Sequence, residues 1–194
     1  MNKSIPALWV LGVIILSVCC TFGQHQSQDS YLNWKDVVQS RLHLYGHRNW
    51  IVVADSAFPV YADPGIETIS ADDDLPTVLH YVAAAISSSH HVRATVFLDR
   101  ELQFVDDHDY PGASDLKHLI LSSFTAEQVS SLPHAEILSK LDEAGKTFRI
   151  LFIKTSATIP YTSVFMRLDC GYMSNDVDRK IKAGVAKASR DRSR

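Results

Sequence analysis

The pattern of apolar and polar positions divides the chain into an apolar N-terminal segment, a long central region and a charged C-terminal end. A continuous apolar run at residues 50–54 is typical of a strand covered on both faces, and the mainly apolar stretches 149–153 and 164–170 predict two more strands. Shorter runs at 66–69 and 92–97 predict two further strands. Because helical patterns separate most of these runs, the order of elements favours an α/β fold with a largely parallel sheet.

Apolar residues recur at helical spacing in four segments. Residue types that start or stop helices flank these segments. The segments are residues 32–45, 77–86, 115–122 and 134–144. Asn33 is a good N-terminal cap for the first segment, and Gly46 suits its C-terminal end. The stretch 124–130 gives no clear prediction.

The first residues have the pattern of a secretory signal peptide. Lys3 supplies a basic start, residues 7–20 are apolar, and small residues precede a cleavage site before Gln24. The sequence therefore predicts a signal peptide over 1–23 and an exported protein, periplasmic or secreted. An uncleaved membrane anchor is the alternative. The polar stretch 24–31 is predicted to be a disordered spacer.

Cysteines limit the covalent chemistry of the exported chain. Cys19 and Cys20 fall inside the predicted signal peptide, although they also leave open a lipoprotein. After cleavage Cys170 is the one cysteine left, so an internal disulfide bond is excluded. Its place in an apolar strand favours a buried, unreactive side chain.

The distribution of charge sets the C-terminal end apart from the rest. The chain of 194 residues has a net charge of −3, which gives no electrostatic case for a nucleic-acid partner. Seven of its 19 Lys and Arg nevertheless lie in residues 179–194. We therefore expect one domain over 32–175 followed by a basic tail over 176–194. The tail is predicted to be frayed or partly helical, with a basic anchor to an anionic membrane or partner as the alternative.

Two acidic stretches contain residue types that bind metals. The aspartates at 72–74 precede Pro76 and favour the positive end of the next helix, although a cation site is the alternative. Residues 106–109 contain three aspartates and His108, but a turn signal follows them, so a loop is the prediction. We predict no metal site.

Two motifs resemble the D-ribose pyranase / L-fucose mutarotase family, and the similarity extends over about residues 32–173. The first motif is a Gly-His pair, an apolar strand and Ala-Asp-x-x-Phe-Pro; the second contains Pro-Tyr near the end of the domain. The matching residues are Gly46, His47, Ala54, Asp55, Phe58, Pro59, Pro160 and Tyr161. The resemblance implies a three-layer α/β/α domain with a mixed, mostly parallel sheet.

The resemblance also implies which side chains carry the chemistry. His47 corresponds to the principal acid/base of the family, and Asp55 would hold a sugar hydroxyl or orient His47. Tyr161 would bind the sugar or relay a proton. In open α/β sheets ligands bind beyond the carboxyl ends of the strands, which is where Asp55 is expected.

Three further positions are implied to bind the substrate: His134, Ser163 and Lys154. Ser163 stands where the family has asparagine and offers a shorter side chain. Lys154 replaces arginine and lacks its planar fork of donors. Ala157 stands where the family has glutamate, so one carboxylate is absent.

The function that the resemblance implies is interconversion of the anomers or ring forms of a free aldose such as ribose or fucose. The reaction needs general acid–base catalysis, and neither a metal nor a redox cofactor is expected. A monosaccharide-binding module of the same fold without activity is the alternative.

One geometric consequence concerns the two ends of the first strand. A strand of six residues spans about 20 Å, so His47 and Asp55, which flank residues 50–54, should not meet within one simple strand. The resemblance implies rings of subunits, often decamers, with the site shared between neighbours. We therefore expect a homo-oligomer in which Tyr161 of one subunit lies near His47 of the next.

Overall fold

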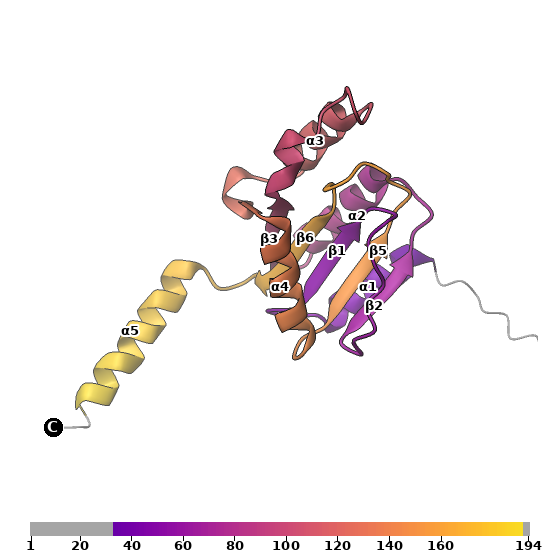
Figure 1. Cartoon of the computed structure of the whole chain (residues 1–194). Coiled ribbons are helices and arrows are strands. Elements are labelled where there is room, and N and C mark those ends of the chain that lie inside the picture. The colour runs from indigo at the N-terminus through magenta and orange to yellow at the C-terminus, as the bar shows by residue number, and fades with distance from the viewer. Residues whose placement is uncertain (1–32, 192–194) are drawn as a thin grey trace, which may run out of the picture. The chain divides into compact units, whose positions relative to one another are not determined.

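A six-stranded mixed sheet forms the centre of the computed structural model, which describes residues 33–191 (Figure 1). The strands are β1 (Trp50–Ala54), β2 (Ile66–Ser70), β3 (Val92–Asp99), β4 (Val129–Leu132), β5 (Ile150–Lys154) and β6 (Val164–Cys170). They lie in the order β2-β5-β1-β6-β3-β4. All neighbours pair in parallel except β6, which runs antiparallel to both β1 and β3. This arrangement confirms the predicted mixed, mostly parallel sheet.

Helices cover both faces of the sheet, which confirms the three-layer α/β/α architecture. The helices are α1 (Trp34–Leu44), α2 (Leu75–Ser87), α3 (Ala113–Ser122), α4 (His134–Gly145) and α5 (Asn175–Asp191). Residues of α1, α2 and α3 form one core with alternate side chains of the strands, such as Ile51 and Val53. Ile137 and Leu141 of α4 form a second core on the opposite face with Val52 and Phe152. Figure 1 shows α4 in front of the sheet and α1 and α2 behind it.

Side-chain caps explain where two of the helices begin. The side chain of Asn33 accepts the backbone N–H of Lys35 and starts α1, as predicted. Asp74 accepts the N–H of Thr77 and starts α2. Hydrogen bonding with the side chain of Thr77, together with this bond from its backbone N–H, lowers the pKa of Asp74. The acidic stretch before α2 therefore serves the helix start that the sequence indicated.

Two elements differ from the prediction. Strand β3 continues to Asp99, two residues beyond the predicted end at residue 97, because β6 pairs with it as far as Leu98 and β4 as far as Asp99. Strand β4 was not predicted at all, since its Val-Ser-Ser-Leu sequence is short and polar at the edge of the sheet. Tertiary pairing rather than local propensity makes this segment a strand.

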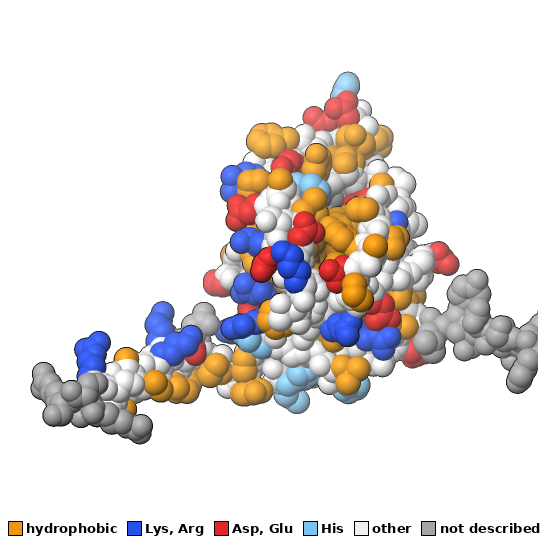
Figure 2. Space-filling model, turned by 60° about the horizontal axis from the view of Figure 1, so that its bottom comes forward, with side chains coloured by type: hydrophobic (Ala, Val, Ile, Leu, Met, Phe, Trp, Pro, Cys, Tyr) orange, Lys and Arg blue, Asp and Glu red, His pale blue; other side chains and the backbone are white. Residues whose placement is uncertain are grey.

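The C-terminal tail, predicted to be frayed or partly helical, forms the helix α5 over its described residues. In α5 the apolar side chains of Val177, Ile181 and Val185 follow one another at four-residue spacing and are all exposed. Lys and Arg side chains lie along the same helix (Figure 2). The predicted signal peptide, with Cys19 and Cys20, and the spacer fall outside the described residues. Between residues 33 and 191 no helix has the length and apolarity needed to cross a membrane.

Candidate functional site

Asp55 directly follows β1, at the carboxyl end of the strand. One oxygen of its carboxylate, Oδ1, accepts the N–H of Ala57 at 3.0 Å. The other, Oδ2, accepts the hydroxyl of Ser163 at 2.8 Å, and this hydroxyl also accepts the backbone N–H of Asp55 at 3.1 Å. Ser163 is buried, with 1% of its surface exposed. Hydrogen bonds therefore hold both oxygens of Asp55. The hydroxyl of Ser163, which was predicted to bind the substrate, bonds instead with Asp55.

His134 is the first residue of α4 and is fixed by two carboxylates. Its backbone N–H donates to both oxygens of Glu101, at 3.0 and 3.1 Å. Its ring nitrogen Nδ1 lies 3.0 Å from Oδ1 of Asp99, the last residue of β3. Burial raises the pKa of Asp99 to about 6, although the hydrogen bond from His134 acts in the opposite direction. Glu101 and Asp55 add smaller upward effects on the same pKa.

Tyr161 reaches His134 from the loop between β5 and β6. The two ring centroids are 5.5 Å apart and the planes meet at 81°, an edge-to-face contact. The backbone φ of Tyr161 is 61°, a left-handed conformation that costs free energy for a bulky residue. The loop is held by Thr162, whose hydroxyl donates to the carbonyl of Ile159, and by Thr155, which donates to Ala54. The surrounding loop thus stabilises a strained tyrosine beside the histidine.

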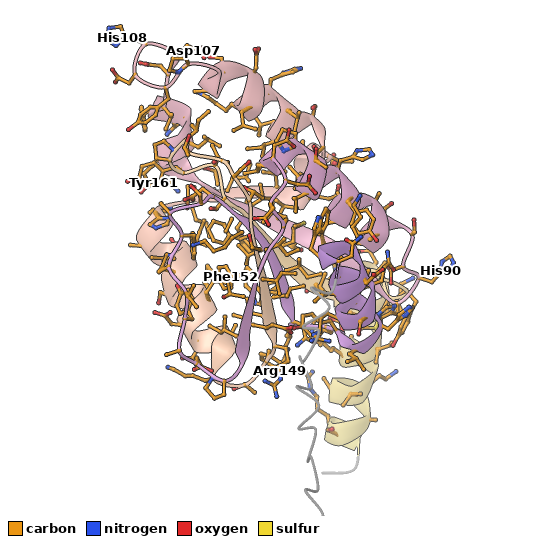
Figure 3. The ribbon with its side chains drawn as sticks, turned by 90° about the vertical axis from the view of Figure 1, so that its right-hand side faces the viewer. His90, Asp107, His108, Arg149, Phe152 and Tyr161 are labelled. Atoms are coloured by element: carbon orange, nitrogen blue, oxygen red, sulfur yellow. The ribbon has the colours of Figure 1, made fainter. Side chains whose placement is uncertain are left out.

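Asp55, Asp99, His134 and Tyr161 line one cavity of about 480 Å³ at the carboxyl end of the sheet. Apolar side chains, among them Phe58 and Leu138, also line it. A cavity of this size accommodates a small organic ligand, and its few polar groups suit orientation of hydroxyls. Figure 3 shows Tyr161 and Arg149, which precedes β5, on opposite sides of Phe152.

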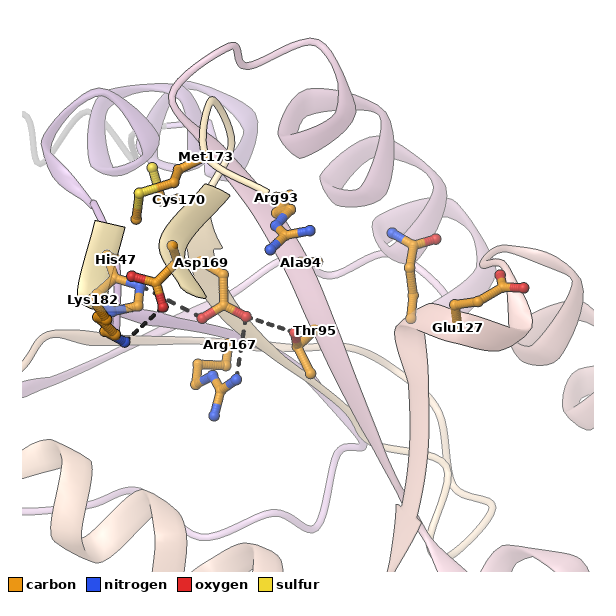
Figure 4. Close-up of a pocket in the computed structure, with 12 residues that line it drawn as sticks. His47, Arg93, Ala94, Thr95, Glu127, Arg167, Asp169, Cys170, Met173 and Lys182 are labelled. Atoms are coloured by element: carbon orange, nitrogen blue, oxygen red, sulfur yellow. Dashed lines mark hydrogen bonds and ion pairs between the residues drawn. The ribbon is translucent and has the colours of Figure 1, made fainter. Parts of the chain in front are cut away.

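His47 lies at the other end of β1, in a second cavity of about 420 Å³ (Figure 4). Its Nδ1 is 3.6 Å from Oδ1 of Asp169. The other oxygen of Asp169 accepts the hydroxyl of Thr95 at 2.6 Å and an N–H of Arg167 at 3.2 Å. His47 and Asp55 therefore do not meet within one chain, as the length of the strand indicated.

The remaining predicted residues have other places. Lys154 ends β5 beside Ala54 of β1 and does not line the cavity of Asp55. Ala157, which stands where the resembling family has glutamate, accepts the N–H of Ser56 through its backbone carbonyl. Cys170 is a free cysteine at the end of β6, and its side chain is partly exposed rather than buried.

Asp99 is the residue at this site that the sequence did not identify. The predicted strand ended at residue 97, so Asp99 fell outside it. The available signal was its position: an acidic residue directly after a buried run, as for Asp55 after β1. The same strand-end rule that singled out Asp55 would have found Asp99.

The acidic loop at 106–109 forms a turn, as predicted. Asp106, His108 and Asp109 bring ligand atoms within 4.8 Å of one another and are all exposed. The carboxylate of Asp106 accepts the N–H groups of His108 and Asp109, and Asp107 accepts those of Gly112 and Ser114. These hydrogen bonds account for the aspartates as turn residues.

Comparisons with known proteins reveal similarity in structure and none in sequence. No family profile matches the sequence, and no curated protein sequence matches it. The structure resembles that of Bacillus subtilis RbsD complexed with D-ribose, with a TM-score of 0.52 and 18% identity, over 71% of this chain and 93% of that chain. FucU from Bifidobacterium longum gives a TM-score of 0.48 and 15% identity over 68% and 90% of the two chains. The fucose mutarotase from Streptococcus pneumoniae, complexed with L-fucose, gives 0.45 and 16% over 66% and 87%.

The similarity to RbsD establishes the class of fold. The domain of this chain has an RbsD-like α/β/α fold, and the match extends over nearly the whole of that relative. Function rests on the site, because one fold carries many activities.

Proposed function

We propose that this chain is a monosaccharide mutarotase or pyranase that interconverts anomers or ring forms of a free aldose. The observation that carries the proposal is the meeting of Asp55, His134 and Tyr161 in one cavity. They come from three segments far apart in the sequence, and the two family-like motifs had marked two of them. The RbsD-like fold, found in a protein complexed with D-ribose, supports a sugar as ligand.

The chemistry requires two proton transfers. A base removes the proton of the anomeric hydroxyl while an acid protonates the ring oxygen; the bond between C1 and the ring oxygen breaks and a C1 carbonyl forms. Rotation about the next carbon–carbon bond and the reverse transfers give the other anomer. Groups with pKa values near neutrality do this well. Asp55 binds a hydroxyl, and Tyr161 donates a hydrogen bond or relays a proton.

The second half of the proposed site comes from a neighbouring subunit. His47 and its partner Asp169 lie at the end of β1 opposite to Asp55. Contact between unlike ends of two copies is head-to-tail and closes into a ring when the rotation permits. His47 of one subunit then acts beside Asp55 and Tyr161 of the next. A mass equal to a single chain in light scattering would remove this part of the proposal.

Anomer exchange measured by saturation-transfer NMR tests the function with ribose, fucose and galactose. We expect the purified protein to accelerate exchange of at least one sugar. Tyr161→Phe keeps the ring contact with His134 and removes the hydroxyl, so exchange should slow by about tenfold or more. Tyr172→Phe is the matched control, because Tyr172 is 82% exposed and lies outside the cavity.

A binding module without activity is the second candidate function. The observation in its favour is Ala157, which makes hydrogen bonds only through its backbone where the resembling family has a carboxylate. This candidate predicts calorimetric binding of a monosaccharide with no acceleration of anomer exchange. Exchange that is slower in Tyr161→Phe than in the wild type excludes it.

A further inference from the structure

Asp99 is a buried charge whose hydrogen bonds are incomplete. Its exposed fraction is 2%, and its oxygen Oδ2 has no hydrogen-bond partner. A carboxylate in such a place is costly, and a hydrophobic residue would stabilise the fold better. Buried groups that reduce stability in this way concentrate at functional sites. Asp99 also lines the cavity that contains Asp55 and Tyr161.

The contact of Asp99 with His134 determines what the histidine ring can do. A carboxylate accepts hydrogen bonds, so the nitrogen Nδ1, 3.0 Å from Oδ1 of Asp99, carries the ring proton. The other nitrogen, Nε2, then keeps its lone pair. The imidazole side chain is partly exposed, at 33%, and lines the cavity. Nε2 is thus the atom available to a ligand.

The groups around this pair come from three segments. Glu101 follows β3 and binds the backbone of His134, so it restrains the start of α4. Asp55 follows β1, and Tyr161 faces His134 from the loop before β6. Both acidic neighbours, Glu101 and Asp55, favour a proton within the cluster. No Lys or Arg belongs to the described lining of this cavity.

We propose that Asp99 and His134 form an acid–base dyad within a single subunit, with His134 Nε2 as the group that exchanges a proton with the sugar. Asp99 is a positioning residue, which fixes the tautomer and the orientation of the ring. The inference rests on the proposed function and adds an acid/base to it. His134 takes the proton of the anomeric hydroxyl or returns one to the ring oxygen. His47 of a neighbour supplies the complementary transfer, so the protons balance.

The kinetic test is Asp99→Asn, which keeps the size and an acceptor oxygen but removes the charge. We expect kcat for anomer exchange to fall by about tenfold or more while KM changes less than threefold. In the wild type, kcat should fall as the pH drops through about 6, where Asp99 gains a proton. The variant should lack this limb. Glu136→Gln is the matched control, because Glu136 lies in the same helix, is half exposed and pairs only with Lys140.

The second test reads the tautomer of His134 directly by ¹⁵N NMR of the ring and does not need activity. The wild type should have the proton on Nδ1, and Asp99→Asn should shift the ring toward the Nε2-H form. A wild-type ring protonated on Nε2 overturns the dyad, even if the variant does not fold. Equal kcat in wild type and Asp99→Asn also overturns it and leaves the proposed function standing. A wild type that does not accelerate exchange overturns the proposed function. The tautomer of His134 in the NMR experiment then decides whether Asp99 positions the ring.

Discussion

At the scale of single residues, the two carboxylates of the cavity have opposite environments. Asp55 accepts hydrogen bonds at both oxygens, from Ala57 and Ser163. Asp99 is bonded at one oxygen only and is buried. Hydrogen bonds favour the charged form and burial favours the neutral one. The cavity therefore contains one carboxylate suited to hold a hydroxyl and one suited to share a proton with a histidine.

The environment of Asp99 predicts how stability depends on pH. Its pKa is raised to about 6 in the folded chain from 3.8. The folded state therefore binds the proton more tightly, and its stability is highest below about pH 4 in this respect and falls as the pH rises through 6. At pH 8 the full shift in pKa lowers the free energy of unfolding by about 3 kcal/mol relative to its value below pH 4.

Urea unfolding of wild type and Asp99→Asn from pH 5 to 8 measures this effect. The wild type should lose free energy of unfolding relative to the variant as the pH rises. A constant difference between the two proteins across this range would contradict it.

At the scale of elements, a residue distant in sequence caps α4. Pro133 precedes the helix and has no side chain that accepts a hydrogen bond, whereas Glu101 accepts the N–H of His134 from 33 positions away. Glu101→Ala should lower the free energy of unfolding by about 1 kcal/mol, as other lost caps do. It should also weaken sugar binding, because His134 is the residue that the cap restrains. Glu101→Gln keeps the acceptor oxygen. It should therefore lose less stability in thermal unfolding and less sugar affinity in calorimetry than Glu101→Ala.

Elements with strong local patterns could be predicted, and elements made by long-range pairing could not. The strand at 50–54 and the cap Asn33 follow from an apolar run and a short polar side chain, and the structure has both where expected. The aspartates at 72–74 were expected at the start of the next helix, and the structure shows that Asp74 is its cap. Strand β4 is two serines between two apolar residues, and only its pairing with β3 makes it a strand.

The site divides in the same way. The strand-end rule and the motifs placed Asp55, while the family match placed His134 and Tyr161. The structure brings all three to one cavity. The contact of His134 with Asp99 depended on the true end of β3, which lies two residues beyond the predicted end at residue 97.

At the scale of the whole molecule, α5 contributes little to the packed domain. The apolar side chains of Val177, Ile181 and Val185 are 46, 54 and 63% exposed. Removing residues 175–194 should therefore change the Tm of the domain by less than about 2 °C. A larger loss would show that the helix packs on the domain or on another copy.

A basic anchor to a membrane, the alternative that the sequence left open for the tail, stays a prediction for α5. An apolar row flanked by Lys and Arg is typical of helices that lie on anionic membranes. The full chain should sediment with phosphatidylglycerol vesicles at low salt, and the Ile181→Asp variant should remain in the supernatant. Self-association through α5 would instead appear without lipid.

Export remains a prediction, and N-terminal sequencing of the mature protein tests the cleavage before Gln24.

Strand β6 connects the two cavities. Ser163, directly before it, holds Asp55, and Asp169, near its end, holds His47. The strand is largely buried and paired on both sides, so it resists bending and sliding. At about 3.3 Å per residue it keeps the two half-sites about 20 Å apart. In the proposed head-to-tail ring this length is the spacing between one proposed site and the next, whereas the rotation between neighbouring copies determines how many of them close the ring.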